Sequence, residues 1–93
     1  MKKYMIVKQP VIDLARFRKK FEKLQPHRKE YGLTDIGLYL SADEPNTVII
    51  MIEYANLERA KAYWHSKVLA EAREKAGVLS HSERVWYTDG YLE

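Results

Sequence analysis

The chain has 93 residues, a formal net charge of +3 and no cysteine. This length predicts one domain with a single core, spanning residues 1–93, and the absence of cysteine excludes disulfides as a source of stability. The 16 Lys and Arg residues are mixed with 13 Asp and Glu residues, so the basic balance does not by itself indicate a nucleic-acid partner. The apolar run before Lys8 is too short for a signal-peptide core or a membrane span, which leads us to expect a cytoplasmic protein with no membrane partner.

The chain begins with a strand and then a helix. Residues 4–11 mix Tyr, Ile, Val and Met, which is typical of a strand. Asp13 can cap the helix that follows, and Pro26 predicts a bend or break within it because proline lacks the amide donor. Gly32 is expected to end the helix in a left-handed conformation. The apolar stripe of this helix is Leu14, Phe17, Phe21, Leu24 and Tyr31.

Residues 34–40 alternate, as an edge strand with one wetter face does. The alternation predicts that Ile36, Leu38 and Leu40 face one way. Asp35, Gly37 and Tyr39 then face the other way. Residues 41–46 have the composition of a turn, so this strand should form a hairpin with the next one.

The next strand, residues 46–54, is apolar on both sides. Val48, Ile50 and Ile52 share one side, and Ile49 and Met51 share the other. One layer of helices can cover only one side, and exposing the other would forgo about 1.5–3 kcal/mol for each large side chain. We therefore expect a homodimer in which the sheet faces of two copies meet.

A second helix is predicted from Asn56, which can cap it, to Gly77, which can end it, and Ser66 can cap a restart within it. Residues 84–88 alternate and form a last strand. The expected buried face of the helix is Leu57, Ala60, Trp64, Val68 or Leu69, Ala72 and Ala76.

The resulting order is β-α-β-β-α-β, which defines an α+β ferredoxin-like sandwich with a four-stranded antiparallel sheet. In that topology the first and third strands are central. The doubly apolar third strand and the alternating second strand agree with these positions.

The sequence resembles the dimeric α+β barrel superfamily, which includes the antibiotic biosynthesis monooxygenases, and more closely a small cyclase- or monooxygenase-like branch of it. The resemblance implies a dimeric barrel with a cavity, while fold alone does not give function. It is carried by Val11-Ile12-Asp13, Phe17 to Phe21, His27-Arg28, Asp43-Glu44-Pro45-Asn46, Leu57-Glu58 with Ala60, Ser66 with Leu69, and Glu74 to Val78.

His27 and Arg28 are the candidate catalytic residues. They follow Leu24 by three and four positions, so one of them can point toward the cleft between helix and sheet. An imidazole there could take a proton from a phenolic or enolic substrate, and Arg28 could hold the resulting anion. The alternative is that both lie at the helix end, solvated or bonding its last carbonyls.

Tyr31, Trp64 and His65 are the candidate ligand-binding residues. Trp64 lies on the apolar face of its helix and could line a cavity for a flat aromatic ligand. The alternative places Trp64 in the core and His65 in solvent beside it. His81 lies in a Ser-containing loop and is expected to be exposed.

We expect no metal and no cofactor. The three histidines show no spacing typical of metal ligands, and the chain has no Gly-rich phosphate loop. The haem-degrading proteins of the superfamily carry an Asn on the first strand and a His about ten residues after a Trp. This chain has Trp64 but neither of the other two residues.

Two functions remain open from the sequence. One is a cofactor-independent monooxygenase, or an isomerase or cyclase, acting on an aromatic or polyketide-like small molecule, with His27 or His65 as base and Arg28 or a Tyr as anion stabiliser. The other is a non-catalytic ligand-binding or stress-related dimer in which the same cavity stores a ligand or is filled by side chains.

Overall fold

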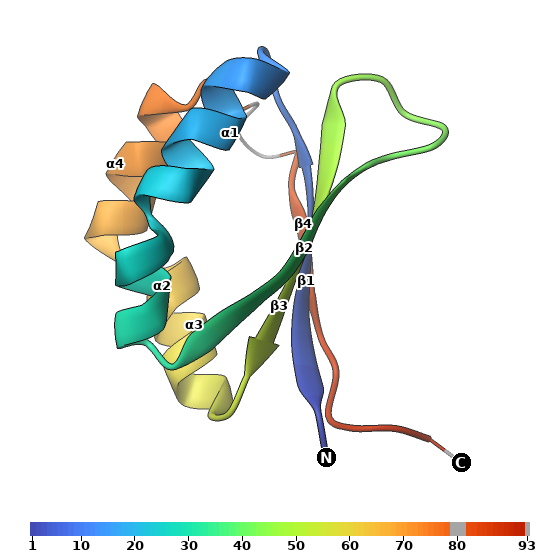
Figure 1. The fold of residues 1–93 in the computed structure, drawn as a ribbon, viewed down its shortest axis with the longest axis vertical. Helices are drawn as coiled ribbons and strands as arrows, with labels where there is room; N and C mark the ends of the chain where they lie inside the picture. Colours follow the sequence, from blue (N-terminus) through green and yellow to red (C-terminus); the bar gives the residue numbers. More distant parts are fainter. Residues whose placement is uncertain (79–81, 93) are drawn as a thin grey trace.

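The structure is a computed structural model that describes residues 1–78 and 82–92. Four helices lie on one face of a four-stranded antiparallel sheet with the strand order β2-β3-β1-β4, and both termini lie at the same end (Figure 1). The predicted ferredoxin-like α+β fold is confirmed. The elements are β1 (Lys3–Pro10), α1 (Leu14–Lys23), α2 (Gln25–Glu30), β2 (Leu33–Leu40), β3 (Thr47–Tyr54), α3 (Leu57–Trp64), α4 (Lys67–Lys75) and β4 (Arg84–Tyr87).

The first helical segment breaks where the proline requires it. Asp13 caps α1 by accepting a hydrogen bond from the Arg16 amide at 3.1 Å. The helix ends before Leu24, and α2 starts with Pro26 in its first turn, where the missing amide costs nothing. Gly32 follows with φ 72°, the left-handed end that the sequence predicts.

The second helical segment is also two helices. Asn56 caps α3 and Ser66 caps α4, each accepting a backbone amide hydrogen bond. The predicted buried face holds at Ala60, Leu69 and Ala76, which are buried, but it is wrong at other positions of α3, before the restart at Ser66. Leu57 is 41% exposed, whereas Tyr63, absent from the predicted stripe, is only 3% exposed.

The two faces of the sheet differ in what covers them. On the helix face, Met5 pairs with Ile52 and Val7 with Ile50, and all four are buried. No helix formed by residues 1–78 or 82–92 covers the opposite face (Figure 1). Its central positions are apolar too: Ile6 of β1, Ile49 and Met51 of β3, and Trp86 of β4, which is 45% exposed.

A β-bulge corrects the predicted facing of β2. Asp35 pairs with Ile52, but Gly37 pairs with Met51, so Ile36 is an extra residue. After the bulge the alternation resumes one residue out of phase. Asp35 therefore lies on the helix face together with Leu38, not on the opposite face with Tyr39 as the alternation predicts.

Two further expectations from the sequence concern membrane-spanning helices and the position of His81. None of the helices in residues 1–78 and 82–92 combines the length and hydrophobicity that crossing a bilayer requires. His81, predicted to be exposed, lies outside the described residues.

Candidate functional site

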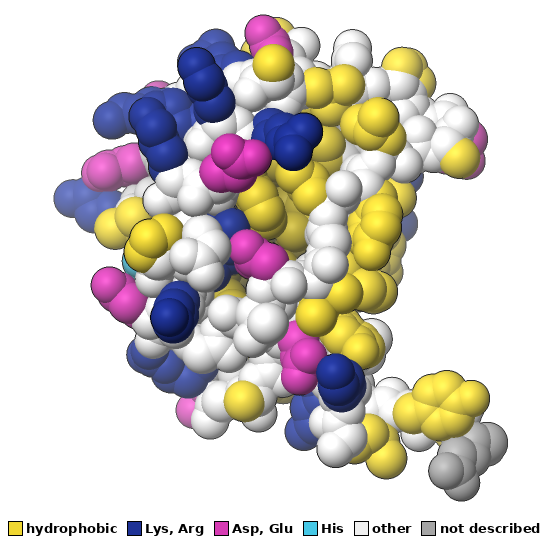
Figure 2. Space-filling view, viewed as in Figure 1, with side chains coloured by type: hydrophobic (Ala, Val, Ile, Leu, Met, Phe, Trp, Pro, Cys, Tyr) yellow, Lys and Arg dark blue, Asp and Glu magenta, His cyan; other side chains and the backbone are white. Residues whose placement is uncertain are grey.

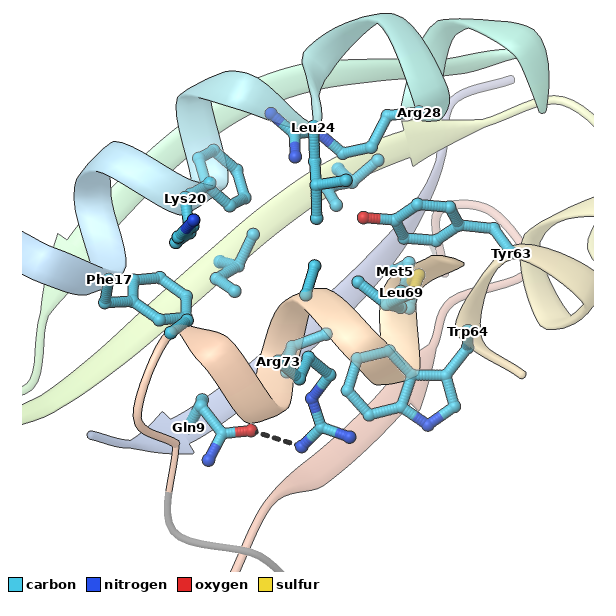
Figure 3. A pocket seen from close by; sticks show the side chains of 16 residues that line it. Met5, Gln9, Phe17, Lys20, Leu24, Arg28, Tyr63, Trp64, Leu69 and Arg73 are labelled. Atoms are coloured by element: carbon cyan, nitrogen blue, oxygen red, sulfur yellow. Dashed lines mark hydrogen bonds between the residues drawn. The ribbon is translucent and has the colours of Figure 1, made fainter. Parts of the chain in front are cut away.

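A small cavity of about 40 Å³ lies between the helices and the sheet (Figure 3). This volume suits a few water molecules or one small group. Its walls are mostly aliphatic and aromatic side chains from β1, β3 and all four helices. Three of the described lining residues are cationic and none is acidic: the cations are Lys20, Arg28 and Arg73. Arg28 pairs with Asp35 and Arg73 with Glu83, so two of these three charges are largely balanced by carboxylates outside the lining.

Arg28 is the most unusual of these residues because its side chain is 1% exposed. Its Nε and Nη2 atoms donate to the two carboxylate oxygens of Asp35 at 2.7 and 2.9 Å, a bidentate ion pair. Its guanidinium carbon lies 3.7 Å from the centre of the Phe21 ring. The remaining nitrogen, Nη1, is buried and has no hydrogen-bond partner within the described part of the chain. A buried donor without a partner costs stability unless a ligand or water satisfies it.

Local sequence explains how Arg28 comes to lie there. Phe21, Leu24 and Arg28 follow one another at three- and four-residue spacing, so they share the inward face across the α1–α2 break. The bulge in β2 brings Asp35 to the same face, where its carboxylate can meet the guanidinium. The pair thus depends on two irregularities, the break at Leu24 and the bulge at Ile36.

Tyr63 is the second polar group at this end of the cavity. Its hydroxyl points into the space between the helices and the sheet, on the same side as Arg28 (Figure 3). Burial raises the pKa of Tyr63 above its usual value of 10.0, and this outweighs the lowering effect of the Arg28 charge, of the hydrogen-bonding interaction between Arg28 and the phenol, and of the Arg73 charge. The phenol therefore stays protonated at neutral pH and can donate a hydrogen bond to an anion.

Arg73 lies at the other end of the cavity. Its Nη2 donates to the Gln9 side-chain oxygen at 2.6 Å and lies 3.3 Å from a Glu83 carboxylate oxygen (Figure 3 shows the Gln9 bond). Its guanidinium also lies 4.6 Å from the Trp64 ring centre. These contacts hold Trp64 against the cavity, where it forms part of the wall as the sequence analysis anticipates.

The other predicted site residues lie outside the cavity lining. The His27 ring is 5.5 Å from the Tyr63 ring, and its Nε2 is 3.2 Å from the Ser66 hydroxyl. Tyr31 contacts both rings, at 5.0 Å from His27 and 5.8 Å from Tyr63. His65 ends α3 and is exposed. The structure therefore brings Arg28 and Trp64 together at the cavity and places His27 and Tyr31 directly behind Tyr63.

The arrangement can bind an oxyanion. The Arg28 Nη1 group, which has two N–H bonds and no partner within the described residues, and the neutral Tyr63 phenol are donors in an apolar, largely water-excluded space, where hydrogen bonds to a charge are strong. Within the described part of the chain, no cluster of three or more His, Cys, Asp or Glu side chains is arranged to hold a metal ion.

Comparison with solved structures defines the class of fold. No known protein family matches the chain by sequence, nor does any curated protein. The architecture, however, is that of the antibiotic biosynthesis monooxygenase-like α+β proteins, as the resemblance in sequence implies.

Three solved structures illustrate this similarity. A candidate antibiotic biosynthesis monooxygenase from Caulobacter crescentus has a TM-score of 0.75 at 19% identity, covering 98% of this chain and 91% of its own. SnoaB, a cofactor-independent oxygenase from Streptomyces nogalater, has a TM-score of 0.74 at 9% identity, with 99% and 95% covered. The monooxygenase ActVA-Orf6 of Streptomyces coelicolor, solved with nanaomycin D, has a TM-score of 0.61 at 17% identity, with 99% and 89% covered. Identities this low establish the shared fold and nothing about the reaction.

Sequence reasoning missed Asp35 and Tyr63. Asp35 was assigned to the wrong face because a bulge leaves no unambiguous trace in the alternation; Gly37 was the one available signal, since a glycine within a strand often marks a bulge. Tyr63 stands three residues after Ala60, a spacing that places both on one helix face.

Proposed function

We propose that this protein is a cofactor-independent monooxygenase, or an isomerase or cyclase, that binds an aromatic or polyketide-like small molecule as an anion between the helices and the sheet. The observation that carries the proposal is the buried Arg28 Nη1, which has no hydrogen-bond partner within the described part of the chain, in a cavity that Tyr63 also lines. The oxygenases among the structures of the same fold support it.

The chemistry would follow from stabilising negative charge. A phenol or enol bound near Arg28 loses its proton more readily, because a guanidinium lowers the pKa of a neighbouring acid. In an oxygenase reaction the resulting carbanion reduces dioxygen: a CH₂ group becomes a carbonyl, one oxygen atom enters the product, and the other leaves as water with both hydrogens. In an isomerase reaction the proton returns at a different carbon. In a cyclase reaction the carbanion attacks a carbonyl of the same molecule, and the proton goes to the new alkoxide.

We assign a role to each candidate residue on this basis. Arg28 holds the anion and Tyr63 donates to it, while Trp64 forms an apolar wall. His27 is the nearest base, and it can reach the substrate only after its ring turns away from Ser66, 3.2 Å from its Nε2. Tyr31 packs on the His27 and Tyr63 rings and positions them.

The second candidate function is a non-catalytic ligand-binding dimer. The observation that favours it is the small volume of the cavity, about 40 Å³. Under this alternative Arg28 and Tyr63 hold a small anion without changing it.

We also propose that the protein is a homodimer. The sheet face opposite the helices carries Ile6, Ile49 and Met51 in adjacent positions of the two central strands, with Trp86 beside Ile6. A contiguous apolar face of this kind favours a protein partner, and a second copy provides a matching surface. A cytoplasmic location stays a prediction from the sequence.

The test is turnover of dithranol, a tricyclic phenol with an activated CH₂ group, under air. An oxygenase should convert it to the quinone and consume one molecule of dioxygen per molecule of product. The Arg28→Gln variant should lose about 10- to 100-fold in kcat/KM, the effect of one charge-assisted hydrogen bond. Lys29→Gln is the control, because Lys29 is an exposed cation of the same helix as Arg28 that lines neither the cavity nor the groove between α1 and β2, and it should be unaffected. Binding of dithranol without turnover, still dependent on Arg28, would support the non-catalytic alternative. Turnover unchanged in Arg28→Gln would contradict the assigned site.

A further inference from the structure

We infer that the ring system of the substrate lies in the groove between α1 and β2 and that only its acidic oxygen enters the inner cavity. Phe21 is the movable side chain that separates the groove from the cavity. This inference rests on the proposed function and adds the substrate class and the route to Arg28. The inner cavity, at about 40 Å³, is too small to contain a molecule of several fused rings.

The groove supplies the missing volume. It measures about 640 Å³, within the range of small-molecule sites, and its floor is Phe17, Phe21, Leu38 and Val48. Figure 2 shows hydrophobic side chains gathered in this hollow between the helix layer and the sheet, with charged side chains around them. The end of the β2–β3 hairpin curves away from the helix layer (Figure 1), which leaves room beside α1.

Phe17 and Phe21 line both the groove and the inner cavity, so they form the wall that separates them. Phe17 is 6% exposed and belongs to the core. Phe21 is only partly buried, and one of its ring faces contacts the Arg28 guanidinium at 3.7 Å. Rotation of Phe21 toward the groove would therefore uncover the guanidinium, and aromatic side chains at partly exposed positions rotate readily.

A second hollow, between α1 and α4, also adjoins the cavity. It is smaller, about 220 Å³, and its rim carries Lys23, Lys75 and Glu71. Charged side chains line the α1–β2 groove as well, namely Arg18 and Glu22, so the larger volume of the groove is what suits it to a molecule of several fused rings. The groove is thus the better subsite for the substrate body.

These dimensions define the substrate class. It is a flat molecule of two or more fused rings with a phenolic or enolic oxygen at one end, so that the oxygen meets Arg28 while the rings lie along Phe21 and Leu38. A single-ring phenol would occupy only the end of the groove beside Phe21 and leave the rest of the groove empty.

The experiment compares two probes, alizarin with three fused rings and para-nitrophenol with one. Ala15 is exposed and lines the groove, and Val68 is 50% exposed and lines the α1–α4 hollow, so Ala15→Trp and Val68→Trp are matched fillings of the two sites. We expect Ala15→Trp to weaken alizarin binding by about tenfold or more, the loss expected for excluding an apolar ring from its site. Its affinity for para-nitrophenol, and the affinity of Val68→Trp for both probes, should not change. Phe21→Leu should speed the association of both probes.

Some contrary results would overturn the groove as the subsite, and others would overturn the proposed function itself. Unchanged alizarin binding in Ala15→Trp, or a loss confined to Val68→Trp, would overturn the inference and leave the proposed function standing. A change in the sedimentation of Ala15→Trp would show that a second copy of the chain occupies the groove, and would also overturn it. If neither probe binds, or if Arg28→Gln binds both as the unchanged protein does, the proposed function itself fails.

Discussion

Replacing Asp35 by Asn should destabilise the fold through Arg28. The substitution keeps the shape of the side chain but removes the charge that faces a guanidinium only 1% exposed. The Asn oxygen can still accept one hydrogen bond, whereas its NH₂ group would face a guanidinium donor. Because Nη1 already has no partner within the described residues, the loss leaves two nitrogens of a buried cation unsatisfied.

The magnitude follows from the exposure of the two partners. Removing one partner of a fully buried pair costs about 3–5 kcal/mol. The Asp35 side chain is 33% exposed, so water compensates part of the loss, and we expect about 2–3 kcal/mol. For a domain of this size that lowers the melting temperature by about 10–20 °C. Arg28→Met should cost less, about 1–2 kcal/mol, because the carboxylate left behind can be hydrated.

The assay is urea unfolding followed by circular dichroism, with Asp89→Asn as the control. Asp89 pairs with Lys3 at 3.2 Å, but its side chain is 92% exposed, so its loss should cost less than about 0.5 kcal/mol. A cost for Asp35→Asn no greater than that for Asp89→Asn would refute the reasoning. So would a larger cost for Arg28→Met than for Asp35→Asn.

Three further outcomes are expected. Met51→Lys, on the sheet face opposite the helices, should give a folded monomer in place of a dimer in sedimentation. Ile50→Lys should unfold the protein, because Ile50 is 7% exposed and lies on the helix face. A folded, dimeric Met51→Lys would contradict the proposed interface. Because burial raises the pKa of Tyr63, the native state keeps a proton that the unfolded chain releases, so the free energy of unfolding should fall as pH rises above about 10. The fall should be smaller in Tyr63→Phe, and an equal fall in the two proteins would contradict this account. Ser66→Ala removes the side-chain oxygen that caps α4 by accepting from the Leu69 amide at 3.2 Å. The free energy of unfolding should fall by about 1 kcal/mol in thermal denaturation, and an unchanged value would mean that α4 does not depend on this cap.

Local chemistry made most of the fold predictable. Asp13, Asn56 and Ser66 were recognised as caps because a short polar side chain before an apolar period satisfies the first amides of a helix. Pro26 was recognised as a break because it lacks an amide. Each of these signals acts within a few residues, so no knowledge of tertiary contacts is needed to read it.

The site was less predictable because it depends on contacts between distant segments. The spacing from Leu24 allowed either His27 or Arg28 to point inward, and the choice of Arg28 required knowing that Asp35 would lie opposite it. That in turn required the bulge, which shifts the alternation by one residue. Roles for His27, Tyr31 and His65 in binding or catalysis stay predictions.

The bulge at Ile36 also matters for anyone who aligns this chain with other proteins of the fold. In a relative that lacks the extra residue, β2 would pair with β3 without interruption, and the residue in register with Ile52 would still face the helices. An alignment of the two chains without a gap, fixed on residues 37–40, would instead match Asp35 with a residue in register with Glu53, on the opposite side of the sheet. The gap therefore belongs at Ile36, and a misplaced gap would assign the partner of the buried arginine to the wrong residue.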